Sequence, residues 1–234
     1  MDDAEVEAVL SNAVRERSGA FEVVTPVLES YRARIERMVR LRMDHRVAGR
    51  LSVSDVMQDA YVEIVRRLPA YLDEPTTGSP EGRSRMPFFL WVRFLAGQAL
   101  LQAHRKHLGT EARDAARDVP LGGPLHGGGA PEASSFMLAH ALVESGISPS
   151  GVAIRQEERE ALDEALANLS TEDREILFMR HFEQLSNKEI AAILGLTAGG
   201  ASLRHLKALG RLQAALSRAG LTFEIGRLNG PDAP

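Results

Sequence analysis

The residues best suited to chemistry lie near the carboxyl end, and their types suit binding to nucleic acid. Ser202, Arg204, His205 and Lys207 lie within the segment 198–216, which we expect to be helical. Polar and cationic side chains on the first turns of a helix can hydrogen-bond base edges and hold phosphates. The pattern predicts a helix that enters the major groove of DNA. Each of these residues alone is also common on a solvated helix face.

Cap and turn signals upstream predict the element that would position this helix. Ser186 precedes Glu189 in an S-x-x-E capping box, in which each side chain satisfies a backbone N–H of the other residue. Gly195 can adopt the positive φ of a helix stop, Leu196 can fill the corner, and Thr197 can cap the final helix. The order cap, helix, glycine, cap and basic helix favours a helix-turn-helix.

The sign of the charge changes within this region. Residues 184–220 contain five basic residues and one acidic residue, whereas residues 151–183 contain four basic and nine acidic residues. A further helix from Glu172 to Phe182, capped by Ser170, is expected in the acidic part. A basic final helix suits an anionic partner.

Composition excludes several classes of protein. The chain has 234 residues, 44% hydrophobic and 26% charged, which indicates a globular protein rather than a disordered or fibrous one. It has no cysteine, so disulfides, thiolate zinc sites and cysteine nucleophiles are excluded. The net charge of −4 argues against a histone-like, non-specific DNA binder. With no apolar run of membrane-spanning length and no secretory signal, we expect a soluble, cytoplasmic protein without membrane association.

The fold class expected is all-α, with two small helical domains joined by a Gly/Pro-rich linker. In the first half, helices are expected at Val27–Met43, Val53–Leu68 and Pro87–His107, and a short helix, Ser134–Val143, can interrupt the linker. The expected divisions are an amino-terminal extension (1–24), a first domain (25–108), a flexible linker (109–154), a second domain (155–220) and a tail (221–234).

One polar helix face in the first half has the composition of a docking surface. Asp55, Gln58 and Asp59 have the spacing i, i+3, i+4 and so share a face, and the opposite, buried face is expected to contain Met57, Tyr61, Ile64, Val65 and Leu68. The run from Asp55 to Tyr61 resembles the D-x-x-Q-[DE]-x-[FY] motif of bacterial sigma factors of the extracytoplasmic-function group. The resemblance implies that Asp55, Gln58 and Asp59 bind the β′ coiled coil of core RNA polymerase.

A second segment resembles the part of these sigma factors that melts and reads the minus-ten promoter element. Residues 89–106 are similar to the family's W-L-x-x-I-A-R-N…D-x-x-R pattern, with Gly97, Gln98 and Gln102 departing from it. Trp91 is expected in the core, because apolar residues surround it. The DNA-binding residues implied for this region are Arg93, Gln98, Gln102, Arg105 and Lys106.

The third resemblance is the helix-turn-helix, whose runs at 169–177 and 185–191 are similar to the family's L-p-x-x-R-e-v-l and l-S-x-x-E-I-A patterns. Leu203 departs from the polar residue usual in the family. The resemblance implies two small helical domains and contacts to the minus-thirty-five element through Arg180, Lys188, Ser202, Arg204 and Lys207. The implied partners are core RNA polymerase (β′ coiled coil and β flap) and promoter DNA, with an anti-sigma factor as a further candidate. No cofactor, metal or catalytic residue is implied.

Two other classes of function remain as alternatives. A stand-alone helix-turn-helix regulator with an amino-terminal sensing or dimerisation domain predicts specific DNA binding by the chain alone. One feature of the sequence would support an enzyme. His104 and His107 have the spacing i, i+3 and lie near Glu111, a pattern that a metal site can use. No third ligand has a recognisable spacing, so a sigma factor is the interpretation that the residues favour.

Overall fold

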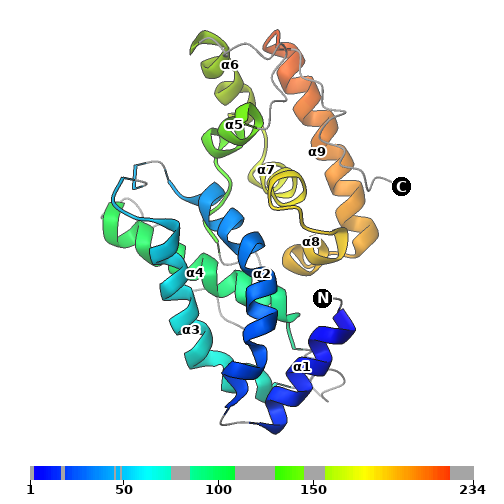
Figure 1. Cartoon of the computed structure of the whole chain (residues 1–234). Helices are drawn as coiled ribbons and strands as arrows, with labels where there is room; N and C mark the ends of the chain where they lie inside the picture. The colour runs from blue at the N-terminus through cyan, green and yellow to red at the C-terminus, as the bar shows by residue number, and fades with distance from the viewer. Residues whose placement is uncertain are drawn as a thin grey trace. The chain divides into compact units, whose positions relative to one another are not determined.

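The chain divides into two compact units, Met1–Asp118 and Val119–Pro234. The computed structural model describes residues 3–16, 19–44, 46–47, 49–74, 85–108, 130–144 and 156–221. Within these residues all regular structure is helical, in agreement with the all-α expectation (Figure 1). Most of the expected linker, the tail and Glu111 lie outside the described residues.

The first unit contains α1 (Asp3–Arg15), α2 (Ala20–Arg42), α3 (Val53–Asp73) and α4 (Phe88–Leu108). The three helices expected from the sequence are present, but α2 begins at Ala20 rather than Val27 and has Pro26 within it. Helices α2, α3 and α4 pack against one another, and their apolar faces form one core. Buried members of this core include Val24, Ile35, Val39, Val56, Ile64, Leu68, Leu95 and Leu100.

Helix α1 lies within the amino-terminal extension 1–24, for which no helix is expected above. Its buried residues Val6, Leu10 and Ala13 lie at helical spacing, and the helix packs against α2 and α3. An ion pair between Glu7 and the buried side chain of Arg85, at 2.9 Å, ties α1 to the segment before α4. The extension is therefore a structural part of the first unit.

An aromatic cluster connects α3 to the start of α4. The ring centroids of Tyr71 and Trp91 are 4.5 Å apart, and Phe88 stacks on Trp91 at 5.7 Å. The hydroxyl of Tyr71 donates to the carbonyl of Met86 at 2.7 Å, and burial raises the pKa of this phenol above its usual value. Trp91 is buried, as expected, and belongs to this cluster rather than to an exposed stacking surface.

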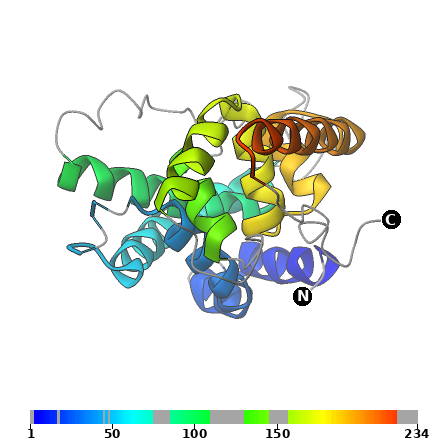
Figure 2. The same cartoon turned by 90° about the horizontal axis from the view of Figure 1, so that it is seen from above.

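The second unit contains α5 (Ser135–Glu144), α6 (Gln156–Ala167), α7 (Thr171–Leu177), a π-helical turn η3 (Phe178–Phe182), α8 (Asn187–Leu194) and α9 (Ala198–Arg218). The long helix α9 packs against α6, α7 and α8 and buries Ala201, Ala208, Leu212 and Ala215 on one face. Figures 1 and 2 show α5 and α6 side by side at one end of this unit.

The short helix expected inside the linker is present as α5, and it belongs to the core of the second unit. Leu138, Ala141 and Leu142 are buried, and α5 packs against α6. Just before α5, the backbone N–H of Ala133 donates to the carboxylate of Glu175 and the carbonyl of Ala133 accepts from Arg174 Nε at 3.1 Å. Residues 130–144, assigned from the sequence to a flexible tether, are thus held against α6 and α7.

Candidate nucleic-acid interface

Three caps fix the two helices of the helix-turn-helix, as the sequence predicts. The Ser186 hydroxyl accepts from the N–H of Glu189 at 3.2 Å, and the Glu189 carboxylate accepts from the N–H of Ser186 at 2.7 Å. Gly195 ends α8 in the left-handed region, with φ 64° and ψ 34°, and Thr197 caps α9 by accepting from the N–H of Gly200 at 3.0 Å. The turn between α8 and α9 is therefore specified by short-range hydrogen bonds and one glycine.

A buried carboxylate connects α7 to α9. Asp173 lies in the first turn of α7, where its N–H donates to the Ser170 hydroxyl at 3.2 Å and confirms the expected cap. One nitrogen of the Arg211 guanidinium, Nη1, lies 2.8 Å from each carboxylate oxygen of Asp173. The Asp173 side chain is almost completely buried, so this pair fixes the position of α9 on the unit. Arg211 and Asp173 are 38 residues apart in the sequence, so no local pattern predicts this pair.

The expected helix 172–182 does not continue as a regular α-helix. It changes at Phe178 to the π-helical turn η3, and Gln184 follows with φ 59°. A π-turn contains an extra residue, which rotates the side chains that follow it. His181 of η3 thereby faces His205 of α9, with their Nε2 atoms 2.7 Å apart. Burial, followed by the charge of Arg180, lowers the pKa of His205.

The residues predicted to contact the minus-thirty-five element differ in exposure. Lys188 on the first turn of α8 and Lys207 on α9 are exposed, whereas Arg180, Ser202 and Arg204 are half-buried. Arg180 Nη1 donates to the carbonyl of Leu185 at 3.1 Å and so supports the turn before α8. Arg204 lies close enough to α7 to help lower the pKa of Glu172, after the larger effects of hydrogen bonds from the Glu172 backbone and Ser170.

Four of the five residues predicted for the minus-ten region share one strip of α4. Gln98, Gln102 and Arg105 have the spacing i, i+4, i+7, and Lys106 lies beside Gln102 at i+4. Gln102 and Lys106 are exposed, and Gln98 and Arg105 are half-buried. Amide and cationic groups therefore lie together on the carboxyl half of this helix.

Arg93 is the exception, and its position corrects the prediction. Its exposed fraction is only 2%, because the first half of α4, residues 88–97, is buried on all sides. A guanidinium enclosed in the first unit cannot reach a phosphate at the surface. Arg93 is therefore a structural residue of the core.

The polar face predicted on α3 is exposed at all three positions, but one of them has a second role. Asp55 forms a capping box with Ser52, whose hydroxyl and N–H donate to Asp55 Oδ2 at 2.7 and 2.9 Å. These hydrogen bonds lower the pKa of Asp55. Gln58 and Asp59 are exposed one turn later. Asp55 thus holds the start of α3, and Gln58 and Asp59 are available to a partner.

The buried face of α3 also needs one correction. Met57, Ile64 and Leu68 are buried and Tyr61 is half-buried, whereas Val65 is 47% exposed. The four other residues have the spacing 0, 4, 7 and 11, and Val65 lies about 100° around the helix from Ile64. Val65 therefore belongs to the outward face.

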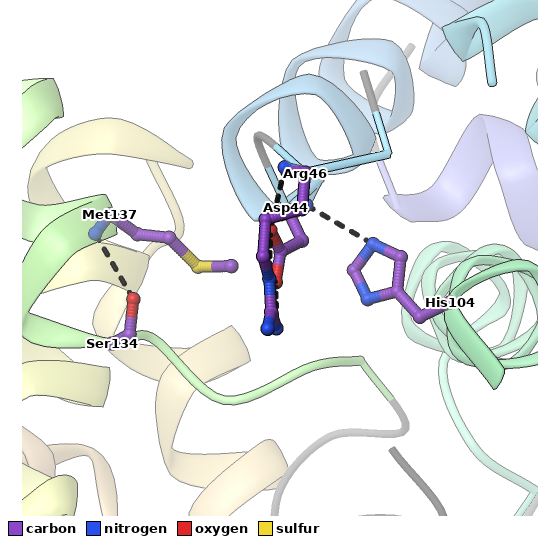
Figure 3. A network of polar contacts seen from close by, with 5 residues as sticks. All are labelled: Asp44, Arg46, His104, Ser134 and Met137. Atoms are coloured by element: carbon purple, nitrogen blue, oxygen red, sulfur yellow. Dashed lines mark hydrogen bonds and ion pairs between the residues drawn. The ribbon is translucent and has the colours of Figure 1, made fainter. Parts of the chain in front are cut away.

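His104, one of the two histidines considered as a metal site, has another function in the fold. His104 Nε2 accepts from the backbone N–H of Asp44 at 3.1 Å, and burial lowers the pKa of His104. Figure 3 shows this ring directed at the backbone of Asp44, while Arg46 pairs with the Asp44 carboxylate.

Figure 3 also draws Ser134 of the second unit, whose hydroxyl accepts from the N–H of Met137 and caps α5. Among the described residues, no group of three histidine or acidic side chains is arranged to hold a metal ion.

No helix in the part of the chain that the structure describes combines the length and apolar character needed to cross a bilayer. The fold and its caps define the second unit as a helix-turn-helix domain with an α9 that presents a partly basic outer surface.

Comparison with known proteins places this domain in a family. The family model for sigma-70, region 4 matches residues 159–212. The proteins named ECF RNA polymerase sigma factor SigD of Mycobacterium bovis and Mycobacterium tuberculosis are each 28% identical to the chain over 220 residues. These alignments cover 94% of this chain and 88% of each relative.

The similarity therefore extends over both units, and the region 4 match coincides with α6 to α9. The chain is thus similar to sigma factors of the extracytoplasmic-function group over most of its length, and its second unit contains the match to region 4 of the sigma-70 family.

Proposed function

We propose that the chain binds core RNA polymerase, recognises promoters and directs the initiation of transcription, with each unit contacting a different part of the promoter. The observation that carries this proposal is the helix-turn-helix of α8 and α9, which coincides with the region 4 match. Similarity to sigma factors over 94% of the chain supports the involvement of both units. RNA synthesis itself belongs to the polymerase, so no catalytic residue is assigned, and the expected location is the cytoplasm.

The second unit is proposed to bind the minus-thirty-five element. Helix α9 enters the major groove, and the exposed Lys188 and Lys207 hold phosphates on either side of it. Ser202 and Arg204 are half-buried and lie at the edges of this surface. Arg180 supports the turn through Leu185, and the β flap of the polymerase is the protein partner expected for this unit.

The first unit is proposed to bind the polymerase and the minus-ten element through two different helices. Gln58 and Asp59 on α3 contact the β′ coiled coil, which carboxylate and amide groups suit. Gln98, Gln102, Arg105 and Lys106 on α4 hold the melted strand, because amides can hydrogen-bond bases while cations hold phosphates.

The first experiment measures association with core RNA polymerase and run-off transcription from genomic fragments. A double variant, Gln58→Ala with Asp59→Ala, is expected to lose most core binding and to keep its helical circular dichroism, because both side chains are exposed and neither caps the helix. Asp55→Ala is unsuitable as a test because it also removes the capping box.

A matched control is Arg66→Ala, which changes another exposed residue of α3 and is expected to bind core enzyme normally. Unchanged core binding by the double variant would refute the assignment of this face. Specific DNA binding by the chain alone, as a dimer and without polymerase, would instead indicate a stand-alone regulator.

A further inference from the structure

The outward face of α9 has an apolar stripe that the fold of the second unit does not use. Leu203 and Leu206 are 54% and 61% exposed. Together with Gly199 and Gly210 they have the spacing 0, 4, 7 and 11, so the four residues follow one line along the helix. The buried face, with Ala201, Ala208 and Leu212, lies on the opposite side.

The two glycines on this stripe are not required by packing inside the unit. A Cβ added at Gly199 or Gly210 would meet no atom within 4 Å. Glycine is nevertheless a weaker helix former than alanine, particularly at an interior position such as Gly210. These glycines weaken the helix, and packing within the unit does not require them. Their presence is consistent with the close approach of an external partner.

Charge and size indicate what kind of partner fits the stripe. Lys207 lies one turn from Leu203, and the exposed Lys188 lies on α8. The acidic residue nearest in sequence to Lys188, Glu189, accepts from the N–H of Ser186 in the capping box. Two leucines are far too small an apolar area for a stable protein interface, which requires roughly 800 Å² from each partner. Narrow apolar contacts with a cation one turn away suit the base edges and phosphates of a DNA groove.

We propose that Leu203 and Leu206 read thymine methyl groups in the major groove of the minus-thirty-five element. This inference rests on the proposed function, since it requires α9 to enter that groove. Of the four bases, thymine is the one that presents an apolar group, its C5-methyl, in the major groove. Exposed leucines on a helix that faces the groove therefore select for thymine. The stripe is also continuous with the DNA-contacting surface assigned to Lys207.

The test replaces thymine by deoxyuridine, which removes only the methyl group. The holoenzyme, formed from the full chain and core RNA polymerase, is titrated with promoter templates that carry one such replacement at each minus-thirty-five thymine in turn. At the contacted positions we expect affinity to fall about fourfold for each methyl group removed, from the contribution of one buried methylene-sized group.

The matching variants are Leu203→Ser and Leu206→Ser. Each is expected to weaken binding to the thymine template and to lose the distinction between thymine and deoxyuridine at one position. Both side chains are mostly exposed, so helical circular dichroism should be unchanged. Ala214→Ser, at another exposed position of α9, is the control and should retain the distinction.

Three outcomes overturn the inference. A holoenzyme that initiates normally but binds both templates equally at every position refutes methyl reading and leaves the proposed function intact. Leucine variants that lose only their association with the polymerase, with no effect of deoxyuridine, show that the stripe is a protein contact. If the chain and core enzyme together never initiate transcription, the proposed function is refuted, and this inference is refuted with it.

Discussion

The two units position their proposed binding surfaces by different means. In the second unit, the orientation of α9 depends on local signals at Ser186, Gly195 and Thr197. In the first unit, the outward faces of α3 and α4 are set by the packing of the helices. Their other faces are buried in a core that has Tyr71 and Trp91 at one end. A DNA-binding surface built around a turn therefore follows from short sequence patterns, whereas a surface on a packed bundle depends on residues that are distant in sequence.

The largest expected effect comes from opening a cavity in the first unit. Leu68 is 2% exposed in the core between the helices, and Leu68→Ala is expected to lower the free energy of unfolding of this unit by about 2–5 kcal/mol. Trp91 is the only tryptophan of the chain and lies in the first unit, so its fluorescence reports this unfolding selectively. Denaturant titration followed by fluorescence should show the lower midpoint.

The matched control for this prediction is Leu212→Ala in α9, a buried leucine of the second unit. It should lower the denaturant midpoint of the part of the circular dichroism signal that comes from the second unit. The midpoint of the Trp91 fluorescence transition should not change. If each substitution shifts both signals equally, the units unfold as one body and the comparison between them fails.

A smaller effect is expected at the turn of the second unit. Gly195→Ala places a Cβ on a residue with φ 64°, which should cost about 1–2 kcal/mol of stability. Gly210→Ala, in the interior of α9 with open space around it, should instead raise stability by about 0.5–1 kcal/mol. Chemical denaturation followed by circular dichroism measures both changes. Equal effects of the two substitutions would contradict the assignment of Gly195 as the left-handed stop.

Most of the helix-turn-helix could be predicted from the sequence because its determinants are local. The caps at Ser170, Ser186 and Thr197 and the stop at Gly195 each involve residues within a few positions. The face of α3 with Gln58 and Asp59 was also predictable, since helical periodicity alone places both residues outside.

The remaining features depend on contacts between residues that are distant in sequence. The burial of Arg93 follows from the enclosure of the first half of α4 by other helices. Helix α1 is held by packing and by the ion pair from Glu7 to Arg85, 78 residues away. The π-turn at 178–182 has no simple sequence signal, so the contact between His181 and His205 could not be foreseen.

The histidine contact leads to the smallest predicted effect, a dependence of stability on pH in the second unit. The two Nε2 atoms lie 2.7 Å apart, so one must donate and the other must accept through an unprotonated nitrogen. Burial and Arg180 lower the pKa of His205 below its ordinary value of 6.5. The unfolded chain therefore binds a proton more readily than the folded chain. The free energy of unfolding should fall as the pH decreases from about 6.5 toward the lowered pKa, and then level off.

Unfolding followed by circular dichroism at about pH 7.5 and about pH 5 measures this dependence, since the interval spans the ordinary histidine pKa. The variant His205→Gln should be less stable at the higher pH, because it disturbs the contact with His181, but should lose less stability than the parent chain between the two conditions. His104→Gln provides the comparison in the first unit, where the Asp44 backbone rather than a second imidazole is the partner. It should alter the pH dependence of the Trp91 signal alone. If His205→Gln leaves the pH dependence of the second unit unchanged, the imidazole contact does not control its acid stability, and other titrating groups must account for it.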